Sequence, residues 1–373
     1  MRDVSTDQPV GIRGQFYLRL SEGVLDPVTV TALALDNGED AVIFLSCDTV
    51  GIHAFIMTLI RDRVRKADPS IPADKIVIHA THAHTGGDLY KSPDDFPCDL
   101  PRMPGPVYQR FFADQAAEAV VEAWRKRQPG QVAWGFGYAT TGYSRRTVYF
   151  DDTSTRPNAV SRPGMMVDGH AVMYGNTRDP RFSHFEAGAD PFVNFLYTFT
   201  ANGALTGAIV NVPCPSQCSM HEWRLTADYW HEVRTTLKKR YGDIHVLPQC
   251  AAAGDLETIV LHVQKAHQRR LELKGTTQRQ EIANRITAAF DEVLEWASKD
   301  RRDQVPLRHR VRTIELTKRR ITPAEYENEK AQLAALNKEA FATQGSPKER
   351  LIHNSLASHR NSRIPSGFRI QFV

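Results

Sequence analysis

The chain of 373 residues is long enough for one large domain or two ordinary ones. Its hydrophobic content of 41% and charged content of 24% exclude an intrinsically disordered chain. The net charge is +4, but the 47 basic and 43 acidic residues are interspersed, which argues against a nucleic-acid-binding protein.

Targeting and disulfide signals are missing from this sequence. No stretch approaches 18 uninterrupted apolar residues, so we expect no transmembrane helix. The first fifteen residues lack the apolar segment of a signal peptide. The five cysteines are an odd number with irregular spacing, unlike a secreted disulfide framework. These features predict a soluble cytoplasmic protein, although an exported parent form stays open.

The first half of the chain alternates strand and helix patterns. Strands are predicted at 28–35, 41–47 and 75–80, and amphipathic helices at 52–66 and 107–126. This alternation is typical of an α/β protein, and we expect a layered mixed sheet with flanking helices. Ligand sites in such sheets gather in loops beyond the carboxyl ends of strands. Asp48 follows one of these strands directly, and a histidine-rich stretch follows another.

The second half continues with further strands and helices. Strands are predicted at 131–139, 192–199, 205–212, 246–250, 311–316 and 367–373, and helical stretches at 226–240, 262–298 and 323–338. Thr322 and Glu325 form a capping box at the start of the last helix. The residue pattern shows no internal repeat and no linker, so we predict one domain over residues 1–373.

The stretch "IVIHATHAHTGGDLY", residues 76–90, is the first candidate for a site. In an extended chain, His82 and His84 would point to the same side, as in metal sites. Zinc needs three or four ligands, and loops at the same edge offer further candidates: Asp48, Asp88, His221 and Asp255. The alternative is that the two imidazoles bind loop backbone or substrate hydroxyls.

Four motifs in order resemble the neutral/alkaline non-lysosomal ceramidase family. They are "THAHTGG", "SRRTVYF", "VNVPCPSQCSM…LTADYW" and "LPQCAAAGDLE", and the resemblance to the family's catalytic domain runs from about residue 9 to about residue 320. The resemblance implies a ceramidase-like α/β fold, a bound zinc ion, a small-molecule substrate and a hydrolytic reaction.

The family's functional residues carry over only in part. His82 matches the family's first zinc histidine, and His84 matches a histidine that lies near the metal without binding it, but Pro215 stands at the second zinc histidine. Ala253 stands where the family has its nucleophilic serine. The family's remaining zinc ligands, a glutamate and a tyrosine, belong to a region beyond the strand at which this sequence ends. We therefore expect a divergent, C-terminally shortened member with little or no ceramidase activity.

Hydrolysis without the serine requires water activated by a base or a metal. Asp255 or His84 is the candidate base, and His82, His84 and Asp48 are the candidate zinc ligands. Asp255 has an alternative role as the cap of a helix. We expect His82, His84, Asp48 and Asp255 to line the main pocket.

Substrate contacts are predicted from three more residues. Arg145 and Arg146 are adjacent, so one would face the cleft and bind a carboxylate, phosphate or sugar hydroxyl. Trp223 could stack on a sugar or acyl chain, or simply pack. The predicted function is hydrolysis of a polar amide or glycoside, and the alternative is a non-catalytic relative that retains a ligand pocket. An exposed edge at 367–373 would favour a homo-oligomer.

Overall fold

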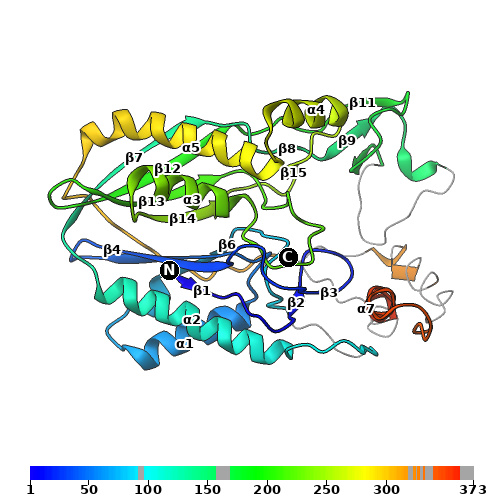
Figure 1. Cartoon of the computed structure of the whole chain (residues 1–373), viewed down its shortest axis with the longest axis horizontal. Helices are drawn as coiled ribbons and strands as arrows, with labels where there is room; N and C mark the ends of the chain where they lie inside the picture. The colour runs from blue at the N-terminus through cyan, green and yellow to red at the C-terminus, as the bar shows by residue number, and fades with distance from the viewer. Residues whose placement is uncertain are drawn as a thin grey trace.

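The computed structural model describes residues 1–90, 96–156, 169–317, 322–324, 326–327, 331 and 339–361. Two four-stranded mixed sheets lie face to face, and helices cover the outer face of each (Figure 1). The layers are helix, sheet, sheet, helix. This arrangement confirms the predicted α/β class with a layered mixed sheet and flanking helices.

The first sheet has the strand order β1-β4-β5-β6. Its elements are β1 (Arg2–Asp3), β4 (Thr29–Asp36), β5 (Ala41–Cys47), α1 (Ala54–Ala67), β6 (Ile76–Ala80) and α2 (Gly105–Arg125). β4 pairs antiparallel with both β1 and β5, and β5 pairs parallel with β6 through the crossover helix α1. The parallel pair brings the carboxyl ends of β5 and β6 to the same edge.

The second sheet repeats this plan. Its elements are β7 (Gly130–Tyr138), β12 (Phe192–Thr200), β13 (Leu205–Val212), α3 (Tyr229–Tyr241), β14 (His245–Cys250) and α5 (Gln278–Ala297). β12 pairs antiparallel with both β7 and β13, and β13 pairs parallel with β14 through α3. The chain therefore runs twice through the order strand, hairpin, helix, parallel strand, helix. The amino-acid sequence shows no internal repeat, but the order and pairing of the elements repeat.

Each sheet forms a hydrophobic core with its own pair of helices. Ile56, Ile60 and Val64 place one face of α1 in the first core. In the second core, Phe290 of α5 is fully buried and packs edge-on against Tyr197. Burial of such apolar faces, more than helix propensity, holds the helices on the sheets.

The two sheets are joined at their inner faces by polar contacts to one carbonyl. The Ser46 hydroxyl donates to the carbonyl oxygen of Pro248 at 2.5 Å, and His79 Nε2 lies 3.1 Å from the same oxygen. Ser46 and His79 belong to the first sheet and Pro248 to the second. His79, one of the three histidines in the predicted stretch, therefore faces the partner sheet.

Short elements gather at one end of the sandwich (Figure 1). They are β2 (Gly11–Ile12), β3 (Arg19–Leu20), β8 (Tyr143–Ser144), β9 (Arg146–Tyr149), β10 (Ala171–Met173), β11 (Phe182–Phe185), β15 (Leu256–Glu257), α4 (Gln264–Lys274) and α7 (Pro347–Asn361). β8 pairs with β15, and β9 lies between β10 and β11. These elements frame the loops that follow β6 and β14.

Two predicted elements of the second half are wrong. The helical stretch 262–298 is two helices, because Gly275 ends α4 in the left-handed conformation (φ 58°) and Thr277 caps α5. Residues 311–316 form no strand and have no neighbouring strand among the described residues, and Leu316 is 80% exposed. Alternating apolar residues alone do not make a strand when no ladder partner is present.

Two other predictions fall wholly or mostly outside the described residues. The strand at 367–373 lies outside them entirely, as does the oligomer edge it would form. Of the helix at 323–338, residues 323–324, 326–327 and 331 are described as helical, and the Tyr326 N–H donates to the Thr322 carbonyl at 3.0 Å.

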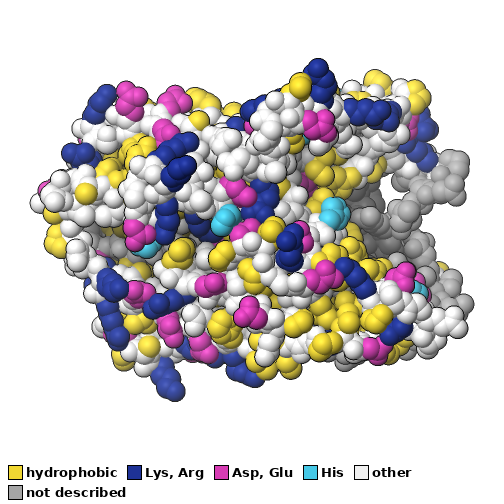
Figure 2. All heavy atoms as spheres, in the orientation of Figure 1, with side chains coloured by type: hydrophobic (Ala, Val, Ile, Leu, Met, Phe, Trp, Pro, Cys, Tyr) yellow, Lys and Arg dark blue, Asp and Glu magenta, His cyan; other side chains and the backbone are white. Residues whose placement is uncertain are grey.

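The surface carries both signs of charge. Figure 2 shows Lys and Arg side chains interspersed with Asp and Glu side chains over the visible face. In the part of the chain that the structure describes, no helix combines the length and apolar character that a membrane crossing requires.

Candidate functional site

The loops that follow β5, β6, β13 and β14 meet at one edge of the two sheets. The His84 N–H donates to the Ser216 carbonyl at 3.2 Å, and the Ser216 hydroxyl donates to the Thr81 carbonyl at 2.8 Å. The Thr85 hydroxyl likewise donates to the Thr226 carbonyl at 2.8 Å. The loop after β6, in the first half, is thus bonded to segments that follow β13, in the second half. This edge is where α/β sheets normally bind ligands.

The histidine pair has a different backbone from the one predicted. His82 adopts the left-handed conformation with φ 59°, so the expected extended chain is wrong at this residue. Its Nδ1 lies 2.7 Å from the Val50 carbonyl, which can only accept, so Nδ1 carries the proton. In the neutral ring, Nε2 of His82 is then an acceptor, and it lies 3.2 Å from Nε2 of His84. The left-handed turn is what brings the two Nε2 atoms together.

His84 is packed into the protein and surrounded by polar groups. Gln217 Nε2 lies 2.6 Å from its Nε2, so this nitrogen faces both the Gln217 amide and His82 Nε2 and can either accept from the amide or donate to His82, not both. Gly14 lies against the ring at φ +122°, where an added Cβ would come within 2.6 Å of it. Burial, then the charges of His82 and Arg19, lower the pKa of His84 to about 3. Burial also lowers the pKa of His82, so both rings are neutral near pH 7.

The two adjacent arginines occupy different surroundings. Arg145 donates from Nε and Nη2 to the Gly254 carbonyl, at 3.1 and 2.6 Å, and from Nη1 to the Tyr174 hydroxyl at 3.1 Å. Its backbone N–H donates to the Asp255 carbonyl at 2.9 Å. Arg146 lies on β9 and pairs with Glu186 instead. Arg145 is therefore fixed to the loop that follows β14, and Arg146 is not.

Tyr174 and Glu257 extend this network, and nothing in the sequence pointed to either. The Tyr174 hydroxyl donates to Glu257 Oε2 at 2.7 Å, and the residues are 83 positions apart in the chain. Glu257 is fully buried, and burial raises its pKa. Burial and the nearby Glu257 raise the pKa of Tyr174 to about 12. The backbone of Tyr174 is left-handed (φ 55°), a conformation that is costly for an aromatic residue.

Asp48 and Asp255 differ in their burial and in their partners. Both oxygens of buried Asp48 bond to Arg234, at 2.8 and 3.1 Å, and Thr29 also donates to this carboxylate. Asp255 is partly exposed. It is followed by the strand β15 rather than a helix, so the alternative role as a helix cap is wrong.

Trp223 is covered on one face by a lysine. The Lys348 ammonium lies 3.7 Å from the centre of the indole ring and also pairs with Glu22 at 2.7 Å. This contact ties α7 to the segment before α3. His221 in the same segment is exposed.

The described side chains do not fit a zinc centre. The separation of 3.2 Å between the Nε2 atoms of His82 and His84 suits two ligands of one ion. Among the described residues, however, no group of three or more His, Cys, Asp or Glu side chains is placed to hold a metal. Asp48 is engaged by Arg234, and Pro215 precedes a loop that presents the Gln217 amide to His84.

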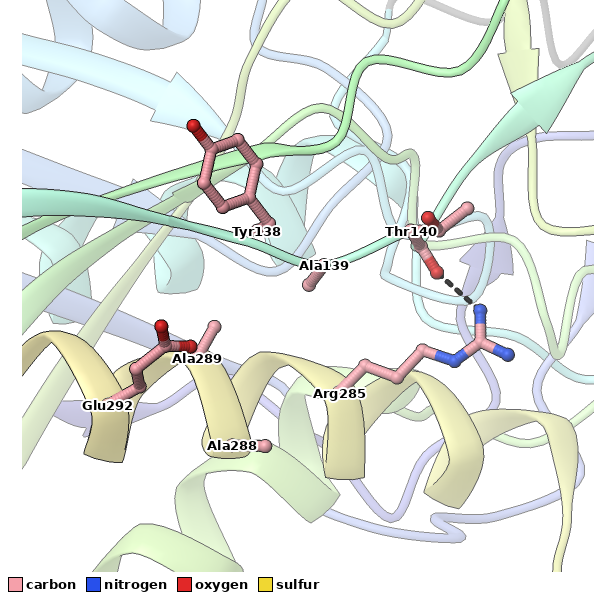
Figure 3. Close-up of a pocket in the computed structure, with 7 residues that line it drawn as sticks. All are labelled: Tyr138, Ala139, Thr140, Arg285, Ala288, Ala289 and Glu292. Atoms are coloured by element: carbon pink, nitrogen blue, oxygen red, sulfur yellow. Dashed lines mark hydrogen bonds between the residues drawn. The ribbon is translucent and has the colours of Figure 1, made fainter.

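Two surface hollows lie away from the histidine pair. One of them, of about 530 Å³, lies between the end of β7 and α5. Figure 3 shows residues that line it, with Tyr138 above and Arg285 and Glu292 on the helix. The other, of about 560 Å³, lies beside Arg127 and Asp303. Neither hollow is lined by any of the four residues expected in the main pocket.

Comparison with known proteins identifies the fold. No protein-family model and no curated protein matches the chain. The solved neutral ceramidase from Pseudomonas aeruginosa matches with 17% identity and a TM-score of 0.58, over 79% of this chain and 44% of that one. A ceramidase complexed with C2 matches with 16% identity and a TM-score of 0.57, over 79% and 43%. The chain spans less than half the length of these proteins, and it has a neutral-ceramidase-like α/β fold.

Proposed function

We propose that this protein is a hydrolase-like relative of the neutral ceramidases that cleaves an amide or glycosidic bond in a small polar molecule. The observation that carries the proposal is the contact of His82 with His84 beyond the carboxyl end of β6, with Arg145 held by the loop that follows β14. The family resemblance and the fold supply the reaction class. Ala253 cannot form a covalent intermediate, so water is the nucleophile.

Water activation falls to a side chain in this proposal. A pKa of about 3 makes His84 a weak base, so we assign the role of base to the partly exposed carboxylate of Asp255. Asp255 takes a proton from water while the water oxygen bonds to the carbonyl or anomeric carbon. The bond to the leaving nitrogen or oxygen then breaks, and that atom takes up the proton. Arg145 would bind the substrate and orient it beside the water.

The alternative is a non-catalytic relative that binds a ligand at this edge. Three observations favour it: Ala253 replaces the nucleophile, Pro215 replaces a metal ligand, and Asp48 is neutralised by Arg234. Such a protein would retain Arg145 and the histidines for binding alone.

Turnover assays separate the two functions. A panel of chromogenic glycosides and polar N-acyl amides would be assayed with chelator and with added zinc, beside a labelled ceramide. We expect turnover of a polar substrate, little or none of ceramide, and activity that survives the chelator. Asp255→Asn and Arg145→Met should each lower kcat/KM by roughly 100-fold or more, and Arg146→Met should not. Binding without turnover across the panel would favour the alternative.

A further inference from the structure

Two arginines near the histidine pair form no salt bridge among the described residues, although Glu222 interacts electrostatically with Arg19 and Glu257 with Arg145. Arg19 is fully buried, and its guanidinium donates only to backbone carbonyls, including that of His84 at 2.5 Å. Arg145 donates to a carbonyl and a phenol. By contrast, Arg146 and Arg234 each pair with a carboxylate. The Arg19 guanidinium is buried without an ion-pair partner, which is costly, and an anion would offset that cost. Arg145 is only partly buried.

Arg145 also retains free donors in a fixed position. A guanidinium has five N–H groups, and three of those of Arg145 are used by Gly254 and Tyr174. One N–H remains on each terminal nitrogen. Two donors on a planar fork match the two oxygens of a carboxylate or phosphate. The bonds to the Gly254 carbonyl hold the fork still, which lowers the entropy lost when a ligand binds.

The charges acting on the histidines are mainly positive. After burial, the charge of Arg145 lowers the pKa of His82, and the charges of Arg19 and Arg145 contribute to lowering that of His84. Asp48 is paired with Arg234 and Glu257 accepts from the Tyr174 hydroxyl, while partly exposed Asp255 is a further acid on the loop that holds Arg145. A metal cation would add to this positive charge, and an anion would reduce it.

One polar atom beside the pair lacks a partner. Gln217 Oε1 is buried and makes no hydrogen bond to the described residues. Gln217 is only 3% exposed, so its amide cannot turn to bulk water. An amide oxygen only accepts, so Oε1 would meet a protonated group of a ligand, while the amide nitrogen keeps a second N–H for an anion.

We propose that this edge binds an oxyanion, a carboxylate or phosphate carried by the substrate. Arg145 would contact the anion directly, Arg19 would supply fixed positive charge behind it, and the Gln217 amide would add a neutral donor. The inference rests on the proposed function, because it names the substrate class of the same site.

Anion binding is measured by calorimetry on the full chain, with inorganic phosphate and acetate as probes and chloride at matched ionic strength as the blank. We expect saturable binding of at least one probe. Arg145→Met should weaken binding roughly 10- to 100-fold, and Arg145→Lys, which keeps the charge but not the fork, should weaken it less. Arg146→Met is the matched control and should bind like the parent. Tighter phosphate binding indicates a phosphorylated substrate, and tighter acetate binding indicates a carboxylic acid.

Three results would overturn the inference: neither probe saturates, Arg146→Met loses as much affinity as Arg145→Met, or the chain binds one zinc ion that is lost in His82→Asn. Thermal unfolding of each variant checks that it is folded. The experiments distinguish a failure of the inference from a failure of the proposed function. Turnover of neutral substrates without anion binding removes only the inference, and anion binding without turnover removes only the hydrolysis.

Discussion

The position of Asp48 in the sequence does not reveal which residue it contacts in the fold. The sequence places it after a buried strand at the ligand-binding edge, where a carboxylate can bind a metal or a substrate. In the structure, both of its oxygens bond to Arg234, which lies 186 residues further along the chain. A pairing of this range depends on how the two halves pack, and no local pattern carries it.

Asp48→Asn should therefore act on stability. Removing one partner of a buried ion pair leaves the other charge uncompensated, and we expect a loss of about 3–5 kcal/mol in the free energy of unfolding. Urea unfolding measures this loss, with Asp255→Asn, at a partly exposed position, as the control. An unchanged unfolding midpoint together with reduced zinc binding would restore Asp48 to the metal site.

Glu257 gives a prediction in pH. Burial raises its pKa, so the folded chain keeps this proton to a higher pH than the unfolded chain does. The stability it contributes is present below the ordinary glutamate pKa and is lost as pH rises through the raised pKa. Glu257→Gln cannot ionise, so it should gain stability relative to the parent between about pH 4 and 7.

The measurement for Glu257 is the urea midpoint of both proteins across that pH range. Tyr174→Phe removes a donor to the carboxylate and should move the parent's loss of stability to higher pH. A difference between the parent and Glu257→Gln that stays constant with pH would mean that Glu257 does not titrate in this range.

At the scale of elements, the sequence was most reliable where apolar periodicity was strong. β5 lies at the predicted 41–47, and α2 lies within two residues of its predicted ends. The errors occur where an end depends on backbone conformation or on a partner: the break at Gly275, and the unpaired segment 311–316. The left-handed turn at His82 belongs to the same class.

Gly86 tests how closely the loops after β5 and β6 must approach. A Cβ at this position would lie 2.4 Å from the Asp48 carbonyl oxygen and 2.8 Å from the Thr49 Cα, so backbone would have to move. We expect Gly86→Ala to lower the free energy of unfolding by about 1–3 kcal/mol and to weaken ligand binding at His82. Gly188→Ala meets nothing within 4 Å and should change neither quantity. Equal effects in the two variants would contradict the close approach.

At the scale of the whole molecule, the sequence predicted the layers but not their duplication. The parallel pairs β5/β6 and β13/β14 arise from different residues, so no comparison of sequence segments shows that they are equivalent. The resemblance to ceramidases predicted the fold that the solved structures match. It could not predict Arg145, Tyr174 and Glu257 as a connected group, because that network depends on short strands at the end of the sandwich.

The proposal of one domain predicts one unfolding transition. Ser46 and His79 bond across the sheets to the Pro248 carbonyl, so the two layers share an interior. Far-ultraviolet circular dichroism and tryptophan fluorescence, the latter including buried Trp230, should give coincident urea curves. Two separated transitions would mean that each half folds on its own.

The doubled topology also divides the site between the halves. The first half carries both imidazoles, and the second carries the Gly254 carbonyl that holds Arg145 and the Gln217 amide that meets His84. A chain cut in the connection at 126–129, between α2 and β7, would separate these groups into two fragments, neither of which contains a complete site. Ligand binding would then return only when the two fragments reassemble. Measuring the binding would therefore measure how well the two halves associate.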